Sequence, residues 1–126
     1  FTPALRGSTT AGTNTYSAQV GTYYKVGKMC FFSLQLTLSA KDAAMAGNLY
    51  ISGLPFNSAR VTALSISRCA NVDFPTNYTQ AGAGLIASNP NIFLAVIGDN
   101  QIISAIATTS ASNTSEFIIS GVYETV

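Results

Sequence analysis

The segment Asn71–Gln80 (NVDFPTNYTQ) holds the most informative set of chemical groups in the sequence: a carboxylate, two aromatic rings and several amides around a proline. Such a mixture commonly binds sugars, because aromatic faces cover C–H surfaces while amides and carboxylates bond hydroxyls. The candidate ligand-binding residues are therefore Asp73, Phe74, Asn77 and Tyr78. The alternative is that Phe74 and Tyr78 anchor a long loop to the core while Asp73 caps a turn.

Catalytic chemistry has few groups available in this chain. Histidine is absent, which removes the usual general base and the usual partner of a serine nucleophile. Glycoside hydrolysis needs two carboxylates roughly 5 to 9.5 Å apart, and only folding or a subunit interface could bring two of the acids together. These acids are Asp42, Asp73, Asp99, Glu116 and Glu124. A pair such as Ser39 with Lys41 has no evident activating neighbour. We expect no catalytic residues and no enzyme activity.

Metal and cofactor sites are not indicated either. Cys30 and Cys69 are too few for a closed structural zinc site and lack CxxC spacing, and Gly82-Ala83-Gly84 is too short for a dinucleotide-binding motif. Each cysteine lies in an apolar, strand-like run, where a free thiol behaves as a small hydrophobic group. We expect free thiols, no metal and no cofactor, with a Cys30–Cys69 disulfide as the alternative.

The charge content excludes strongly electrostatic partners. The 126 residues carry six lysines and arginines and five acids, a net charge of +1, and 9% are charged, where roughly 25% is usual. The basic residues are scattered, so no stripe exists that could neutralise phosphates, and we expect no nucleic-acid partner. No stretch approaches the ~20 apolar residues of a membrane span, so we expect no membrane insertion.

The apolar content predicts surface hidden by another subunit. Hydrophobic residues make up 48% of the chain, and the mean hydropathy is +0.32. These values are high for a small domain, which has a large surface for its volume. The alternative is an exterior rich in serine and threonine, which carries solubility without charge.

The hydrophobic pattern has a period of two, which is typical of strands. In Met29–Leu38 (MCFFSLQLTL), one face carries Cys30, Phe32, Leu34, Leu36 and Leu38, and the other includes Ser33, Gln35 and Thr37. Val20–Val26 precedes this run as the first strand of a hairpin. Gly98-Asp99-Asn100 predicts a tight connection between two runs that are apolar on both faces, Ile92–Ile97 and Ile102–Ala107. The further predicted strands are Leu49–Leu54, Arg60–Cys69, Asn91–Ile97, Gln101–Thr108 and Glu116–Tyr123. The polar segments Gly7–Thr15 and Thr108–Ser115 and the alanine-rich Ala40–Ala46 read as loops.

Short strands at regular spacing without a convincing helix predict an all-β fold. We expect residues 1–126 to form a single antiparallel β-sandwich domain, jelly-roll-like in its strand pattern. The N-terminus lacks an initiator methionine and a signal-peptide pattern, so the chain reads as part of a longer protein.

Several motifs together resemble a known family. Three lie near the start: Phe1–Gly12 (FTPALRGSTTAG), Tyr16–Gln19 (YSAQ) and Gly21–Gly27 (GTYYKVG). Two follow later: Leu36–Phe56, which contains ISGLPF, and Phe117–Tyr123 (FIISGVY). In this order they resemble the C-terminal domains of bacteriophage tail fibres and tailspikes. The motifs contain no catalytic residue.

The resemblance implies a β-sandwich that assembles as a homotrimer at the distal end of a virion fibre or spike. Its partners would then be the rest of the fibre or spike and a bacterial surface polysaccharide, lipopolysaccharide or capsule, recognised during host adsorption. A non-binding trimerisation cap is the main alternative. A glycan depolymerase is less favoured, because that activity usually resides in a preceding β-helix that this chain lacks. The sequence names neither the host, nor the glycan, nor its linkage.

Overall fold

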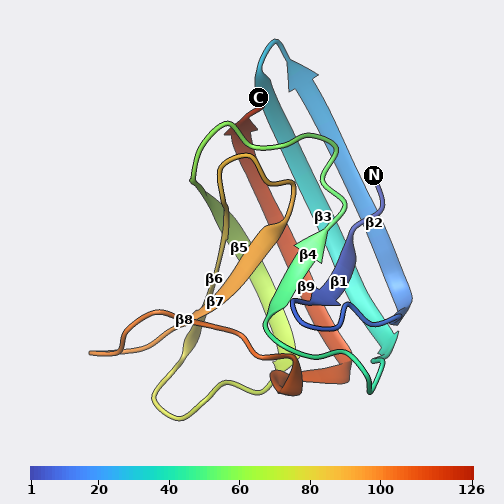
Figure 1. The fold of residues 1–126 in the computed structure, drawn as a ribbon, viewed down its shortest axis with the longest axis vertical. Coiled ribbons are helices and arrows are strands. Elements are labelled where there is room, and N and C mark those ends of the chain that lie inside the picture. Colours follow the sequence, from blue (N-terminus) through green and yellow to red (C-terminus); the bar gives the residue numbers. More distant parts are fainter.

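The computed structural model describes all 126 residues as a β-structure of nine strands and one short 3₁₀ turn (Figure 1). The strands are β1 (Ala4–Gly7), β2 (Thr15–Val26), β3 (Met29–Ala40), β4 (Leu49–Ser52), β5 (Thr62–Val72), β6 (Gln80–Leu85), β7 (Ile92–Ile97), β8 (Ser104–Ala105) and β9 (Ala111–Glu124). The 3₁₀ turn η1 spans Thr108–Ser110. The structure contains no helix with the length and apolar character needed to cross a membrane.

The strands form one continuous antiparallel path in the order β1-β4-β7-β6-β5-β9-β3-β2, with β8 paired to β7. Strand β5 belongs to both halves of this path. Its first residues, Thr62–Leu64, pair with β6, whereas the strand pairs with β9 from Ser65 onward. After this change of partner, the β5–β9 pairing shifts register between Ile66 and Arg68 and again between Ala70 and Val72. The predicted antiparallel all-β fold is confirmed: two layers that share β5 enclose the core.

The two ends of the path meet, so the sheet is nearly closed. The amino nitrogen of Phe1 donates to the carbonyl of Gly21 at 2.8 Å, and Gln19 Nε2 donates to the carbonyl of Pro3 at 2.9 Å. The backbone N–H of Leu5 donates to the Tyr16 hydroxyl at 3.0 Å. Side chains of β2 thus cover the free edge of β1. Without this cover, the edge could pair with another chain.

The core follows from alternation along β3. Cys30, Phe32, Leu34, Leu36 and Leu38 are buried, and the residues between them are exposed or half-buried. From the opposite layer, β4 and β7 contribute the buried side chains Leu49, Ile51, Ile92, Leu94 and Val96. Both cysteines are free, as predicted, with Cys30 in the core and Cys69 half-buried. One face of each strand therefore points into a single core, as the period of two indicates.

Two segments differ from the sequence-based expectation. The predicted strand Gln101–Thr108 is reduced to the two residues of β8, and most of the apolar run Ile102–Ala107 lies exposed. The segment Thr108–Ser115, expected as an exposed loop, instead supplies η1 and the beginning of β9, with Thr108, Ala111 and Ser115 buried. Local polarity was misleading here, because the Ser115 hydroxyl donates a hydrogen bond to the Asn71 carbonyl and is thereby satisfied inside the fold.

Candidate functional site

A polar cleft lies where β5 and β6 separate. The two strands pair only at Thr62–Leu64, after which β5 follows β9 while β6 stays with β7. The opening between them has a volume of about 360 Å³. Its lining residues are Ile66, Ser67, Arg68, Cys69, Phe74, Thr79, Gln80 and Ala81. The cleft therefore results from one strand changing sheets, with the loop between β5 and β6 at its far end.

Phe74 forms part of the apolar wall of this cleft. Its side chain is half-buried and packs against the core cluster, so the ring is fixed in position. Thr79, Gln80 and Ser67 are exposed around it. An aromatic ring beside amide and hydroxyl groups matches the chemistry expected for sugar binding.

Arg68 adds a cationic group to the cleft, and an ion pair with Glu116 fixes its position. Its Nε donates to Glu116 Oε2 at 2.8 Å, and Gln35 Nε2 donates to Glu116 Oε1 at 3.5 Å. The Arg68 side chain is 58% exposed, whereas that of Glu116 is 17% exposed. The carboxylate holds the guanidinium on one side, and the Nη donors remain free for a ligand.

The four sequence-predicted residues do not line one cavity. Asp73 lies in a separate polar hollow of about 410 Å³, together with Asn71, Val72, Ser110, Ser112 and Thr114. The backbone N–H of Asp73 donates to the carbonyl of Ser110 at 2.8 Å, which ties the loop to η1. Only Phe74 among the four lines the cleft.

Asn77 and Tyr78 face the connection between β7 and β8. Asn77 has a positive φ of 71° and its carbonyl lies directly against Gly98. The Tyr78 hydroxyl donates to the carbonyl of Ile102 at 2.9 Å, and its ring packs against the core. This geometry matches the anchoring role that the sequence left open for Tyr78.

Sequence reasoning missed the main polar residues of the cleft. Thr79 and Gln80 lie at the end of the segment that was singled out, so composition alone could have included them. Arg68 stands in a predicted strand, and its place beside Phe74 depends on the separation of β5 from β6, which no local pattern indicates.

The acidic groups are mostly engaged in structural contacts. Asp42 accepts hydrogen bonds from the backbone N–H groups of Ala44 and Thr13, and these bonds lower the pKa of its carboxyl. Glu124 pairs with Arg60 at 2.6 Å. No carboxylate lines the cleft between β5 and β6. Nowhere in the chain do three or more histidine, cysteine or acidic side chains gather in a group that could hold a metal ion.

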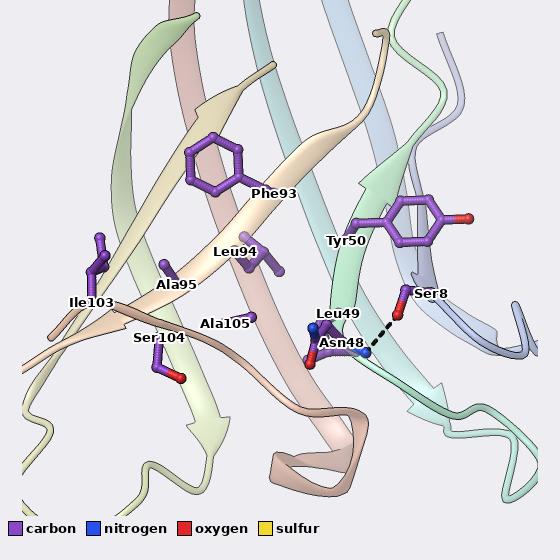
Figure 2. Close-up of a pocket in the computed structure, with 10 residues that line it drawn as sticks. All are labelled: Ser8, Asn48, Leu49, Tyr50, Phe93, Leu94, Ala95, Ile103, Ser104 and Ala105. Atoms are coloured by element: carbon purple, nitrogen blue, oxygen red, sulfur yellow. Dashed lines mark hydrogen bonds between the residues drawn. The ribbon is translucent and has the colours of Figure 1, made fainter.

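An apolar groove of about 360 Å³ lies on the layer that contains β4 and β7 (Figure 2). Tyr50 of β4 stands on one side and Ile103 on the other, with Phe93 and Ala95 of β7 between them. The groove also includes Asn48, whose backbone N–H donates to the Ser8 hydroxyl at 2.9 Å. Seven of its ten lining residues are hydrophobic, so it suits aliphatic or aromatic groups better than sugar hydroxyls.

Cys69, which lines the cleft, makes the stability of the fold depend on pH. Burial raises the pKa of its thiol from 9.0 to about 11. Between these values the unfolded chain has lost the thiol proton and the folded chain has kept it, so the free energy of unfolding falls as the pH rises from 9 to 11. Burial shifts the pKa of the Tyr123 hydroxyl upward as well, which adds to the alkaline loss.

We therefore expect thermal melts to show a falling midpoint across this alkaline range, with a shallower fall for Cys69→Ala. The comparison isolates the thiol, because every other group, Tyr123 included, is the same in both proteins. Equal slopes for the two proteins would show that Cys69 ionises freely in the folded state.

The geometry defines the class of the molecule as an all-β sandwich domain with a polar cleft at the opening between its layers. Its fold is similar to part of one solved structure, the Dettilon tailspike protein, with a TM-score of 0.77 and 21% sequence identity. The match covers 98% of this chain but 23% of the tailspike chain. No protein-family model and no curated protein matches the sequence.

Proposed function

We propose that this domain belongs to the distal tail fibre or spike of a bacteriophage virion and binds a bacterial surface glycan during host adsorption, as a homotrimer. The observation that carries the proposal is the similarity of nearly the whole fold to a segment of a tailspike. The motifs from Phe1 to Gly27 and from Phe117 to Tyr123 support it independently. The glycan would be lipopolysaccharide or capsule.

The cleft between β5 and β6 supplies chemistry suited to this role. The Phe74 ring offers a face for sugar C–H groups, Gln80 and Thr79 offer donors and acceptors, and the free Nη groups of Arg68 offer directed donors. Its volume of about 360 Å³ is near the lower end of small-ligand sites. A short unit of a larger polysaccharide therefore fits better than a long segment.

Binding of a glycan at one cleft is expected to be weak, and the presence of several clefts in one assembly would raise the overall affinity. Three copies on one tip would engage a repetitive surface polymer at high effective concentration, so adhesion can be firm while each contact stays weak. Because charge is scarce, binding should depend little on salt, unlike binding to a polyanion.

The proposal does not include catalysis. The cleft lining contains no carboxylate, and the chain has no histidine that could act as a base. Incubation with lipopolysaccharide or capsule should therefore release no new reducing ends, and sustained release would contradict this part of the proposal.

The second candidate function is a trimerisation cap without a ligand. Exposed apolar side chains favour it, because they would suit subunit contact equally well in a domain that binds nothing. The two candidates differ in their glycan affinity.

The test uses a Thr79→Ala/Gln80→Ala variant of the 126-residue chain on an array of purified lipopolysaccharide and capsular oligosaccharides. Both side chains are exposed, so stability should stay within about 0.5 kcal/mol. Losing two polar contacts should weaken array binding about tenfold. Phe74→Ala and Tyr78→Ala are poorer probes, because both rings also pack against the core.

Asn57→Ala is the matched control, because Asn57 is exposed in the loop between β4 and β5, outside the cleft, and its side chain makes no hydrogen bond. This control should bind like the parent chain. Full affinity in the Thr79→Ala/Gln80→Ala variant would remove the cleft from the binding site, and no array binding by the parent chain would favour the cap.

A further inference from the structure

The connection between β7 and β8 projects from the body of the domain (Figure 1). We call Gly98–Ile103 the arm. It presents Ile102 and Ile103 at 87% and 60% exposure, and Ile102 is the most exposed large hydrophobic side chain in the chain. Two such side chains on a projecting segment are unfavourable in water unless another surface covers them.

The arm is held in place by specific contacts. The Tyr78 hydroxyl donates to the carbonyl of Ile102, and the backbone N–H of Thr79 donates to the carbonyl of Ile97 at 3.1 Å. Gly98 lies against the carbonyl of Asn77. At its base, Ile103 lines the apolar groove beside Phe93 and Ala95, so arm and groove form one apolar surface (Figure 2). The isoleucines are thus presented by an anchored segment.

A complementary surface lies on the outer face of β2 and β3, in the other layer. Two small polar residues, Thr22 and Ser33, pair across the strands there. They stand between two larger cross-strand pairs, Val20 with Gln35 and Tyr24 with Phe31. A shallow hollow therefore lies on each side of the Thr22–Ser33 pair. The hollow toward Val20 and Gln35 has a volume of about 290 Å³, and the one toward Tyr24 and Phe31 about 280 Å³. No charged residue lines either hollow.

We infer that the arm of one copy docks with Ile102 and Ile103 in the hollows beside the Thr22–Ser33 pair of the next copy. The arm is convex and apolar, and the hollows are concave, uncharged and large enough for branched aliphatic side chains. In a trimer the arm of each copy docks on the next copy around the ring, so the contact is heterologous, and such contacts close when the rotation does. This inference rests on the proposed trimer and names the surfaces that form it.

The first test measures the mass in solution by light scattering. The parent chain should give about three times the chain mass of 13.1 kDa, and Ile102→Asp/Ile103→Asp should give a monomer. Ser33→Trp, which fills the hollows on the receiving surface, should also give a monomer. Val61→Asp is the matched control, since Val61 is 71% exposed in the loop before β5 and should leave the trimer intact.

The second test mixes the two monomeric variants. The arm variant keeps its hollows and the Ser33→Trp variant keeps its arm, so together they can form one productive contact and cannot close a ring. The mixture should contain a heterodimer, while neither variant associates alone. Circular dichroism on each variant checks that the fold is retained.

The outcomes separate the two proposals. A monomeric parent chain would contradict the proposed trimer, and the docking inference would fall with it. Trimers that persist in both interface variants would overturn the docking inference and leave the proposed trimer standing. Dissociated variants that form no heterodimer would also overturn it, because that result places the contact elsewhere.

Discussion

Phe32→Ala should lower the free energy of unfolding by about 3 to 5 kcal/mol, because it removes a large aromatic side chain from a close-packed core. Phe32 is 5% exposed and makes edge-on contacts with the rings of Phe1 and Tyr123 at centroid distances of 6.3 and 5.9 Å. The lost contacts therefore connect β3 with both the N-terminal segment and β9. Denaturant unfolding, followed by circular dichroism, measures the change.

The neighbouring residue provides the control. Phe31 has the same side chain on the same strand but points to the outer face, where it is 49% exposed. Phe31→Ala should cost less than about 1 kcal/mol of stability, because only part of the side-chain surface is buried on folding. It should instead weaken self-association, since Phe31 borders one of the hollows. Similar stability losses for the two variants would contradict the assignment of the two faces.

This pair also shows what the sequence could predict about the fold. From Phe32 to Leu38 apolar and polar side chains alternate, and a strand with one buried face has a signal of period two that needs no tertiary information. The hairpin from Val20 to Leu38 and the loop at Ala40–Ala46 follow from the same local reasoning, and the structure confirms both.

Strand β6 illustrates what local reasoning could not predict. Its sequence QAGAGL has little strand propensity and no clear alternation. It forms because neighbouring side chains cover it: the Phe93 ring lies where a Cβ of Gly84 would be, and the end of Ile97 approaches Gly82. An aromatic side chain covers this strand glycine from the neighbouring strand. The sequence alone cannot predict this contact, because it depends on the pairing of β6 with β7.

The candidate site was predictable only in part, for the same reason. Composition located the loop and Phe74, but the cleft depends on β5 leaving β6 after Leu64, and that change of partner brings Arg68 to the site. Likewise, the apolar run Ile102–Ala107 was expected to be a covered strand. Its first residues, Ile102 and Ile103, instead lie exposed on the arm, which is the observation behind the docking inference.

Gly98→Ala should have a large effect through a different mechanism, overpacking at the junction of the loop and the arm. A Cβ at residue 98 would overlap the carbonyl oxygen of Asn77 and would also approach the Gln101 side chain. The overlapping atom belongs to the backbone, so a rotamer change cannot relieve the clash and the segments must move apart. We expect a loss of about 1 to 3 kcal/mol in the free energy of unfolding.

Gly82→Ala is the matched control. A Cβ at that position would meet only the end of the Ile97 side chain, at 3.2 Å, which can shift at small cost. Its effect on unfolding should therefore be much smaller than that of Gly98→Ala, although both glycines lie in or beside neighbouring strands. Equal losses would mean that the loop yields freely at Asn77.

The Gly98→Ala prediction extends from stability to both proposed activities, because this junction holds together the arm and the loop that ends at the proposed glycan-binding cleft. Separation at residue 98 would strain the hydrogen bond from Tyr78 to Ile102 and the one from Thr79 to Ile97. Thr79 lines the cleft and its N–H donates the second of these bonds, and just beyond the arm the N–H of Ile106 donates to the carbonyl of Leu94, so amide exchange should accelerate at Thr79 and at Ile106. Hydrogen exchange measured by mass spectrometry on the parent and Gly98→Ala chains checks this, with Gly82→Ala as reference. If exchange accelerated at Ile106 alone, the arm and the loop at Thr79 would be independent, and the proposed assembly surface could change without any effect on the cleft.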